Sequence, residues 1–444
     1  MFSESRLWQR IVSHASADAR RPAYVDRSLC QSLSYGDLVE QAQSHATGDR
    51  CDAFLPCDNT IHFAPLFLGT LLAGRSVLPT RTDLPAKELE RLAMIVAQNE
   101  AARLEPALLL TTSGSTAVPK TVRRSIRSLD AVSEAMVNAI GFTAADRAVA
   151  AVPLSHSYGL EHGLLAPLWA GSTVLLCDGL DLPRLIEALA DGATIFPAVP
   201  SMIEMLTRVS ADLSLKTLRR VYTAGAPLPA AVANTFQQHF GIPIGQVYGA
   251  TEIGSVLYRD PARDSAESVG RGMAGVSIRI LSTDDDRRVL PVGEEGEVAI
   301  AAPSMLSGYV NEAVELADGH YPTGDIGRLN ENGELILVGR VRLLIDVGGA
   351  KVNPLEVERV LEAHPAVATA VVLPLALSET VRKIRAIIVP ADPANPPLVS
   401  MLREHARQHL APYKVPRVIE FRDSLPRTAA GKIARQELAT MEAP

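Results

Sequence analysis

Short apolar runs and longer amphipathic stretches alternate along much of the chain. Several short runs of five or six residues, rich in β-branched or apolar side chains, have the length of strands. They occupy residues 148–152, 173–177, 219–223 and 276–281. Residues 129–140 and 229–240 instead have the pattern of helices. This alternation predicts an α/β fold in which helices flank β-sheets.

The pattern changes near residue 270 to closely spaced strands. Asn332-Gly333 separates the strand-like residues 325–329 from 334–338, which is the strongest short signal for a β-hairpin. Beyond residue 339 we expect a strand, a helix, two strands and a further helix. These elements lie at 343–347, 354–364, 367–373, 383–389 and from 398 onwards. The pattern predicts a large N-terminal domain over residues 1–339 and a small α+β domain over 343–444.

Composition excludes several classes of function. With 43 basic and 50 acidic residues, the net charge of −7 provides no field that attracts nucleic acid. The four cysteines are scattered and form no CxxC pair, which argues against a disulfide framework or a structural metal. They are Cys30, Cys51, Cys57 and Cys177. The N-terminus lacks the pattern of a secretory signal, and we expect a cytoplasmic protein without a membrane span.

A loop rich in hydroxyl groups follows the apolar residues 108–110. It reads Thr111-Thr112-Ser113-Gly114-Ser115-Thr116-Ala117-Val118-Pro119-Lys120. Backbone N–H groups and hydroxyls can surround phosphate oxygens here, while the Lys120 ammonium supplies positive charge. The Walker pattern GxxxxGK[ST] is absent from this segment. The alternative interpretation is an ordinary surface turn rich in serine and threonine.

A second polar segment, Tyr248-Gly249-Ala250-Thr251-Glu252, follows another strand-like stretch. The Glu252 carboxylate can hold Mg²⁺ through oxygen, and the Tyr248 ring can pack near an adenosine. The alternative is a glycine turn at a strand end with a solvated glutamate.

Three further residues complete a candidate nucleotide site. Asp325, in Tyr321-Pro322-Thr323-Gly324-Asp325, can accept both ribose hydroxyls, and Arg340 can contact phosphate or ribose. Lys432 lies on a glycine-containing loop close to the end of the sequence. Taken singly, Asp325 could cap a turn and Lys432 could be a solvated surface charge.

In this order and spacing, these segments resemble the adenylate-forming superfamily of acyl-CoA synthetases, aryl-CoA ligases, luciferases and nonribosomal peptide adenylation domains. The resemblance extends over nearly the whole chain through weaker matches. These are Leu33-Ser34-Tyr35-Gly36-Asp37-Leu38, Leu71-Leu72-Ala73-Gly74, Gly225-Ala226-Pro227-Leu228, Gly296-Glu297-Val298 and Gly308-Tyr309.

The resemblance implies a reaction in two halves, with ATP and Mg²⁺ as cofactors. A carboxylate attacks the α-phosphate of ATP and forms an acyl-adenylate with release of pyrophosphate. The thiol of CoA, or of phosphopantetheine on an acyl carrier protein, then takes the acyl group and releases AMP. The family fold combines a large N-terminal domain with a small mobile C-terminal domain, in agreement with the expected boundary.

The resemblance also implies roles for individual residues. The nucleotide contacts are Thr112, Ser113, Gly114, Ser115, Thr116, Lys120, Gly225, Ala226, Pro227, Tyr248, Gly249, Asp325 and Arg340. The catalytic group comprises Lys432, Thr251, Glu252 and His156, with Glu252 as the metal ligand. Lys432 is expected to enter the site only in the adenylating conformation. Residues 340–342 are the expected hinge, centred on Arg342, and its movement brings the 348–351 loop toward the site.

The segment 152–159 indicates the class of acid. It contains no carboxylate at the place where amino-acid-activating members carry an aspartate, so we expect an aryl or a short or medium acyl acid. The expected acyl pocket consists of His156, Tyr158, Ala224 and Ala250. The alternative for His156 is a histidine satisfied within a turn or the core.

Four residues depart from the family pattern: Ala117, Thr121, Asp346 and Lys351. Ala117 and Thr121 could alter closure of the phosphate loop, whereas Asp346 and Lys351 bear on the thioester-forming conformation more than on adenylation. A non-catalytic homologue that binds an acyl group or a nucleotide is one alternative function. Adenylation without transfer to CoA is a second alternative. A P-loop kinase or ATPase is disfavoured by the missing Walker spacing.

Overall fold

The computed structural model of the 444-residue chain describes most of the sequence. The described residues are 1–27, 29–47, 54–82, 86–101, 105–112, 120–177, 181–209, 213, 215–283, 287–310, 312–343, 345–347, 350–376, 382–427 and 433–440. They fall into two compact units. The first comprises Met1–Ile278, Ala299–Tyr321 and Asn332–Leu335, and the second comprises Arg279–Val298, Pro322–Glu331 and Ile336–Pro444.

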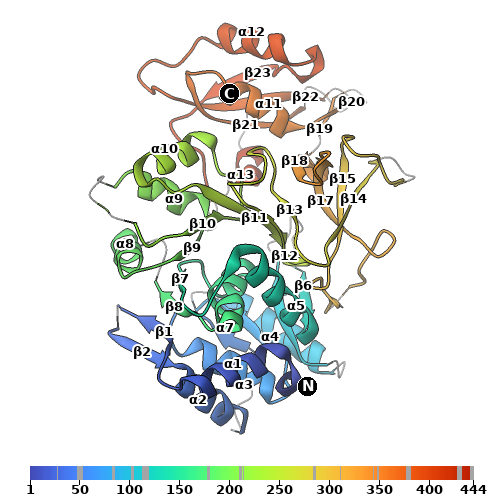
Figure 1. Ribbon diagram of the computed structural model, residues 1–444. Coiled ribbons are helices and arrows are strands. Elements are labelled where there is room, and N and C mark those ends of the chain that lie inside the picture. The colour runs from blue at the N-terminus through green and yellow to red at the C-terminus, as the bar shows by residue number, and fades with distance from the viewer. Residues whose placement is uncertain are drawn as a thin grey trace. The chain divides into compact units, whose positions relative to one another are not determined.

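The elements of the first unit from the N-terminus to β13 are drawn from blue to yellow in Figure 1. Its helices are η1 (Phe2–Glu4), α1 (Arg6–Ala17), α2 (Tyr35–Thr47), α3 (Phe63–Leu72), α4 (Ala86–Ala101), α5 (Ile126–Met136), η2 (Val137–Gly141), α6 (Ser157–Leu160), η3 (Glu161–Leu165), α7 (Ala166–Ala170), α8 (Leu182–Ala190), α9 (Pro200–Thr207) and α10 (Ala230–Phe240). Its strands are β1 (Pro22–Asp26), β2 (Gln31–Ser34), β3 (Phe54–Pro56), β4 (Leu78–Thr80), β5 (Ala107–Thr111), β6 (Thr121–Ser125), β7 (Arg147–Ala150), β8 (Thr173–Leu176), β9 (Ile195–Ala198), β10 (Arg220–Thr223), β11 (Ile244–Ala250), β12 (Gly254–Arg259), β13 (Arg271–Gly272) and β16 (Gly308–Tyr309).

A nine-stranded sheet forms the centre of this unit, in the order β13-β12-β11-β10-β9-β7-β8-β1-β2. Strands β8, β7, β9, β10 and β11 run parallel to their neighbours within this series. Their carboxyl ends therefore meet at one edge of the sheet. Three of the expected strands, at 148–152, 173–177 and 219–223, correspond to β7, β8 and β10.

Both faces of this sheet are buried, because successive side chains of each strand point to opposite sides. On β8, Val174 and Leu176 join a core that includes residues of α1, α2, α3, α5 and α7. Leu175 joins a second core that includes residues of α8, α9 and α10. The α/β fold with helices on both faces of the sheet is thus confirmed.

Two expected elements differ in detail. The helix expected at 129–140 begins at Ile126, because the Ser125 side chain caps it by accepting a hydrogen bond from Ser128 N. It changes to a π-helical turn at Val137. The strand expected at 276–281 is β14 (Ser277–Leu281), which belongs to a separate four-stranded sheet rather than to the nine-stranded one.

That second sheet has the order β14-β15-β17-β18, with β15 at Gly296–Ala301, β17 at Tyr321–Leu329 and β18 at Leu335–Arg340. The turn between β17 and β18 contains the expected Asn332-Gly333, and Gly333 has a φ of 74°, which glycine adopts without strain. The hairpin predicted from the sequence is confirmed.

The remaining elements of the second unit form a small α+β structure. They are η4 (Val341–Leu343), β19 (Ile345–Val347), β20 (Ala350–Val352), α11 (Pro354–Glu362), β21 (Val367–Ala376), β22 (Arg382–Pro390), α12 (Val399–His409), η5 (Pro412–Lys414), β23 (Val418–Phe421) and α13 (Arg435–Thr440). Strands β21, β22 and β23 form one sheet, and the side chains of α11 and α12 pack in a core with residues of all three strands. No helix in the described ranges has the length and apolar character needed to cross a bilayer.

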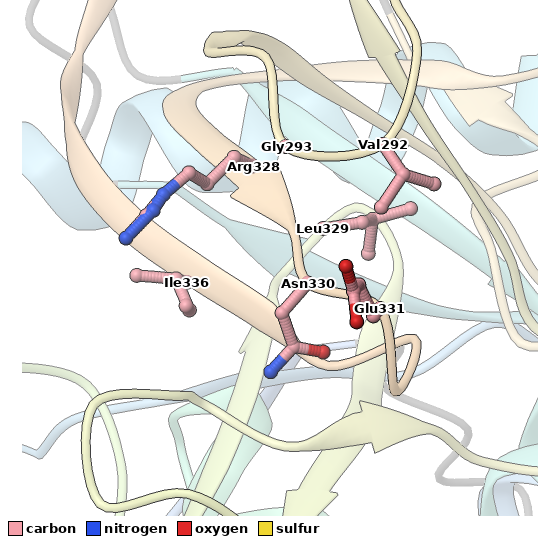
Figure 2. Close-up of a pocket in the computed structure, with 7 residues that line it drawn as sticks. All are labelled: Val292, Gly293, Arg328, Leu329, Asn330, Glu331 and Ile336. Atoms are coloured by element: carbon pink, nitrogen blue, oxygen red, sulfur yellow. The ribbon is translucent and has the colours of Figure 1, made fainter.

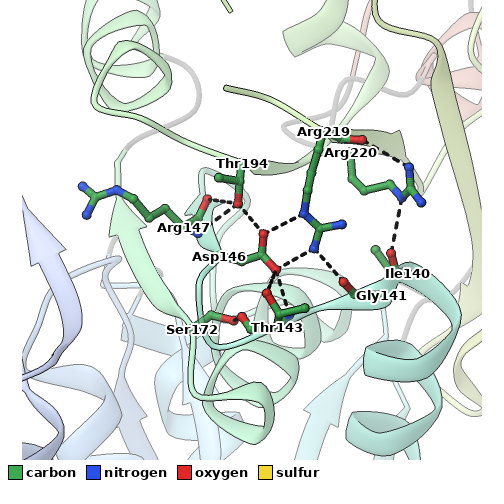
Figure 3. Close-up of polar contacts among 9 residues, drawn as sticks. All are labelled: Ile140, Gly141, Thr143, Asp146, Arg147, Ser172, Thr194, Arg219 and Arg220. Carbon is green, nitrogen blue, oxygen red and sulfur yellow. Dashed lines mark hydrogen bonds and ion pairs between the residues drawn. The ribbon is translucent and has the colours of Figure 1, made fainter. Parts of the chain in front are cut away.

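The Asp146 side chain connects three strands at the amino edge of the central sheet through hydrogen bonds. Asp146 lies just before β7, Thr194 just before β9 and Arg219 just before β10. The Asp146 carboxylate accepts from Arg219 Nε at 2.8 Å and Nη2 at 2.5 Å. It also accepts from Thr194 Oγ1 at 2.7 Å and from Thr143 N at 2.7 Å. Figure 3 shows these donors surrounding the carboxylate.

These contacts predict a dependence of stability on pH. Burial alone raises the pKa of Asp146, but the hydrogen bonds from Arg219, Thr194 and Thr143 outweigh it and lower the pKa to about 2. Since the folded pKa lies below the unfolded one, the stabilisation is complete above a pH of about 4 and is lost as the pH falls toward 2.

We expect Asp146→Asn to lower the free energy of unfolding at pH 7 by about 2 kcal/mol. The difference between the two proteins should shrink between pH 4 and pH 2, since only the unsubstituted chain loses this carboxylate there. Urea denaturation followed by tryptophan fluorescence at several pH values measures both quantities. A pH-independent difference between the proteins would contradict the assignment.

Candidate active site

The carboxyl edge of the parallel strands gathers several of the predicted site residues. His156 and Tyr158 follow β7, Ala224 follows β10, and Thr251 and Glu252 follow β11. Because β7, β9, β10 and β11 are parallel neighbours, these segments emerge at the same edge of the sheet. Residues from three distant parts of the sequence are thus collected on one side of the fold.

The ends of the predicted phosphate loop are held together by a hairpin. Strands β5 and β6 pair antiparallel, with Thr111 opposite Thr121. Thr112 N donates to the Lys120 backbone oxygen at 2.9 Å, which continues this ladder by one step. The other predicted loop residues, Ser113, Gly114, Ser115, Thr116 and Ala117, lie outside the described residues.

Lys120 lies against two side chains of the segment around β16. Its ammonium forms an ion pair with the Glu312 carboxylate. It also lies over the face of the Tyr309 ring, 4.9 Å from the centroid. The Lys120 side chain is one-third exposed, so its charge can reach a ligand from solvent.

Glu252 shares this cluster with two tyrosines. Tyr309 Oη donates to Glu252 Oε1 at 3.2 Å and lies 3.1 Å from Tyr321 Oη. Burial, the hydrogen bond with Tyr321 and the nearby Glu252 charge raise the pKa of Tyr309, which therefore stays protonated. Lys120 and Glu252 thus contact the same side chain: Lys120 lies over the Tyr309 ring, and Glu252 accepts from its hydroxyl.

The surroundings of Glu252 fit a single carboxylate ligand for Mg²⁺. The residue is half-buried, and its Oε1 atom accepts the tyrosine proton. Mg²⁺ in nucleotide sites commonly takes one or two carboxylates and completes its shell with phosphate and water. Within the described ranges no group of three histidine, cysteine, aspartate or glutamate residues could hold a metal alone. The single Glu252 carboxylate fits a metal that brings phosphate and water ligands with it.

The turn from β11 to β12 depends on glycine. A Cβ atom on Gly249 would lie 2.2 Å from the Gly254 backbone oxygen, so a side chain there would push the two strands apart. Gly254 has a φ of 75°, which other residues rarely adopt. Tyr248 is buried beside this turn and Ala250 is half-buried at its start. The backbone that carries Thr251 and Glu252 is thus fixed by close packing.

The segment after β10 presents mainly backbone. Gly225 has a φ of 83° and is exposed, as is Pro227, while Ala226 is half-buried. Ala224 is buried and donates its N–H to the Ala198 oxygen at 3.3 Å. This bend therefore exposes backbone and little side chain at the end of β10.

The two residues expected near the acid have different surroundings. His156 is exposed and is the residue before α6. The Tyr158 hydroxyl donates to the Ala198 oxygen at 3.1 Å, and its ring lies 4.7 Å from the His162 ring. Tyr158 therefore joins the segment after β7 to the end of β9.

A buried polar network behind this edge escaped the sequence analysis. Arg124 on β6 is fully buried and donates to Glu161 Oε1 at 3.1 Å. Glu161 Oε2 accepts from Ser255 N at 2.9 Å and from Ser255 Oγ at 2.7 Å. Arg124 Nη1 also lies 3.5 Å from the Thr251 backbone oxygen. The ion pair thus contacts the segments on both sides of Glu252.

Two further side chains extend the network. His162 Nδ1 lies 2.8 Å from Tyr222 Oη, and its Nε2 lies 3.0 Å from Ser255 Oγ. Since Ser255 gives its one proton to Glu161, it must accept from His162 Nε2, and Tyr222 then donates to Nδ1. Burial lowers the pKa of His162 to about 3, so the ring is neutral. In the sequence, Glu161 and His162 interrupt an otherwise apolar run. Two polar residues in such a run indicate a buried polar network, and this was the signal available.

The second unit contains the predicted ribose contacts. Arg340 Nε donates to Asp325 Oδ1 at 2.5 Å, across the neighbouring strands β18 and β17. Thr323 Oγ1 accepts from Asp325 N at 3.1 Å and fixes the turn at the carboxylate. The two residues that the sequence analysis assigned to ribose are therefore in direct contact.

Other predicted residues of this unit cannot be compared with the structure. Lys432, Gly348 and Gly349 lie outside the described residues. Arg342 lies in η4, and Asp346 and Lys351 pair across β19 and β20, but their side chains are not described.

An open pocket lies beside the turn of the β17–β18 hairpin (Figure 2). Its lining residues are Val292, Gly293, Arg328, Leu329, Asn330, Glu331 and Ile336. None of the residues predicted to bind nucleotide or acid is among them.

Comparison with known proteins identifies the class. The AMP-binding enzyme model matches residues 95–310, and the AMP-binding enzyme C-terminal domain model matches 356–432. The two models match separate, successive parts of the chain. The chain belongs to the AMP-binding enzyme family, the adenylate-forming superfamily that its motifs resemble.

Similar proteins support this assignment. The medium-chain fatty-acid–CoA ligase of Escherichia coli is 30% identical, over 85% of this chain and 72% of its own length. The probable CoA ligase CCL8 of Humulus lupulus is 31% identical, over 78% of this chain and 62% of its own. ATP-bound MatB from Rhodopseudomonas palustris has the same fold, with a TM-score of 0.85, 22% identity and 98% of both chains covered. The chain thus spans about three-fifths of the length of CCL8.

Proposed function

We propose that the protein activates a carboxylic acid with ATP and transfers the acyl group to a thiol. A carboxylate oxygen bonds to the α-phosphorus while the bond to the bridging oxygen breaks, and pyrophosphate leaves. The thiol sulfur then bonds to the acyl carbon, AMP leaves, and a thioester remains. The observation that carries this proposal is the collection of family motif residues at one edge of the sheet, in a chain whose relatives are acid–CoA ligases.

The roles of the nucleotide-binding residues are part of the proposal. Residues 112–120 hold the β- and γ-phosphates, with Lys120 as the cation. Glu252 holds Mg²⁺, which neutralises phosphate charge when it is bound, and Thr251 lies beside the phosphates. Asp325 and Arg340 hold the ribose, and their 2.5 Å contact supports this because it orients the carboxylate.

Lys432 is the proposed catalytic cation of the first half-reaction. It bridges the substrate carboxylate and the α-phosphate, where negative charge redistributes during the attack. Adenylyl transfer depends mainly on positioning and charge neutralisation, so one well-placed ammonium contributes strongly. The domain boundary at residue 339, a hinge at 340–342 centred on Arg342 and a cytoplasmic location belong to the same proposal.

We propose an aryl or a short or medium acyl acid as the substrate. Two observations favour it over an amino acid. Residues 152–159 contain no carboxylate that could pair with an α-amine. The next one along the chain, Glu161, is 2% exposed and already bound to Arg124 and Ser255. His156, Tyr158, Ala224 and Ala250 form the proposed acyl pocket.

Pyrophosphate exchange into ATP tests the first half-reaction. We expect exchange to depend on one class of acid in a panel of aryl, medium-chain, long-chain and amino acids. Thioester formation with CoA, or with a phosphopantetheine-bearing carrier protein, then identifies the acceptor. If ATP binds and no acid drives exchange, the non-catalytic alternative is favoured. If the adenylate forms and neither thiol accepts it, the protein performs adenylation alone.

A further inference from the structure

Gly308-Tyr309 matches the family motifs, yet the proposed function assigns it no part in the site. We propose that Tyr309 is a positioning residue of the nucleotide site. Its hydroxyl orients the Glu252 carboxylate, and its ring holds the Lys120 ammonium. This inference rests on the proposed function, because that function makes Glu252 and Lys120 ligands of magnesium and phosphate.

The backbone around Tyr309 is fixed to both segments that it serves. Strand β16 pairs antiparallel with β6, which begins directly after Lys120. Val310 N donates to the Thr121 oxygen at 2.9 Å and extends this pairing. Leu306 N donates to the Glu252 backbone oxygen at 2.6 Å. Tyr309 is therefore held by main-chain contacts between the end of the phosphate loop and the metal ligand.

The hydroxyl of Tyr309 has a defined direction. A carboxylate can only accept hydrogen bonds, so the single Tyr309 proton points to Glu252 Oε1 at 3.2 Å. The Tyr321 hydroxyl, 3.1 Å away, must then donate to the Tyr309 oxygen. This relay fixes one oxygen of Glu252 and so determines where its second oxygen points.

The ring of Tyr309 positions the Lys120 ammonium, the proposed phosphate ligand. The Lys120 ammonium lies 4.9 Å from the ring centroid, in the geometry of a cation–π contact. The ring limits the directions that this flexible side chain can take, without consuming its charge. A residue with one polar tip and one apolar face is required to do both tasks.

Glu312 opposes nucleotide binding in this arrangement. Its carboxylate pairs with Lys120, and the two side chains are 41% and 33% exposed. An exposed ion pair of this kind is weak, so phosphate oxygens can replace it at small cost. Glu312 is a competitor for the ammonium, whereas Tyr309 is compatible with the bound state.

Three variants separate these contributions. Tyr309→Phe keeps the ring and removes the hydroxyl, Tyr309→Leu removes both, and Glu312→Gln removes the competing charge. Calorimetry with ATP, in the presence of Mg²⁺ or EDTA, measures binding independently of turnover. Exchange kinetics give KM and kcat for the same proteins.

We expect Tyr309→Phe to raise the Mg²⁺ concentration for half-maximal ATP binding about tenfold, which corresponds to one charge-assisted hydrogen bond. Its ATP binding in EDTA should match that of the unsubstituted chain, and its KM should change more than its kcat. Tyr309→Leu should weaken binding under both conditions. Glu312→Gln should tighten binding in EDTA by up to about threefold.

Tyr35→Phe is the matched control, since its hydroxyl donates to the buried Ser172 oxygen at 2.8 Å. It should lower Tm and leave the Mg²⁺ dependence unchanged. If Tyr309→Phe behaves like this control, or weakens ATP binding equally with Mg²⁺ and EDTA, the positioning role is wrong. Absence of ATP binding in the unsubstituted chain overturns the proposed function as well. If the unsubstituted chain binds ATP but catalyses no pyrophosphate exchange with any acid, only the proposed function is overturned.

Discussion

Glu161→Gln should lower the free energy of unfolding by about 3–5 kcal/mol, the usual cost of leaving a buried charge without its partner. The Glu161 and Arg124 side chains are 2% and 0% exposed, so water cannot replace the lost carboxylate. Urea denaturation followed by tryptophan fluorescence measures the effect. Both tryptophans, Trp8 and Trp169, lie in the same compact unit as the ion pair.

Glu204→Gln provides the control for this prediction. Glu204 pairs with Arg208 at 2.6 Å, but the two side chains are 48% and 75% exposed. Its loss should change stability by no more than about 1 kcal/mol. Equal effects of the two substitutions would show that burial does not make the Arg124–Glu161 pair important.

Lys432→Ala should slow acid-dependent pyrophosphate exchange about 10²–10³-fold, because it removes one positioned cation from the adenylyl transfer step. ATP binding should change little, since the proposal confines Lys432 to the adenylating conformation. Transfer from a chemically supplied acyl-adenylate to the thiol should also be retained. Exchange assays and single-turnover thioester formation measure the two halves separately.

Lys383→Ala is a suitable comparison, since Lys383 is an exposed lysine on β22 in the same unit. It should exchange pyrophosphate at the rate of the unsubstituted chain. Unchanged exchange in Lys432→Ala would remove this lysine from the first half-reaction. A parallel loss of thioester formation from the supplied adenylate would indicate a general structural defect instead.

Much of the fold followed from local patterns. Residues 174–177 are all apolar, as a strand covered by helices on both faces requires. In β8, Val174 and Leu176 face one core and Leu175 faces the other. The turn at Asn332-Gly333 was equally direct, because glycine there adopts a φ of 74°. These features depend on a few residues that are neighbours in the sequence, so they can be predicted from the sequence alone.

The buried ion pair could not be found in the same way. Arg124 lies next to Arg123 in a short strand, and two arginines in succession usually indicate a solvent-facing segment. Its partner Glu161 is 37 residues away in sequence, so only the packing of β6 against η3 reveals the pair. Roles carried by the resemblance, such as those of Lys432 and Ser113, stay predictions.

The grouping of candidate ligand contacts at strand ends has a consequence for how such a protein can change. The side chains that stabilise the central sheet lie along its strands and belong to two internal cores. The exposed residues Gly225, Pro227 and His156 belong instead to the connecting segments beyond the strands. Substitutions in those segments can alter ligand preference at little cost in folding free energy. New substrate specificities can therefore be selected on this framework while its interior stays the same.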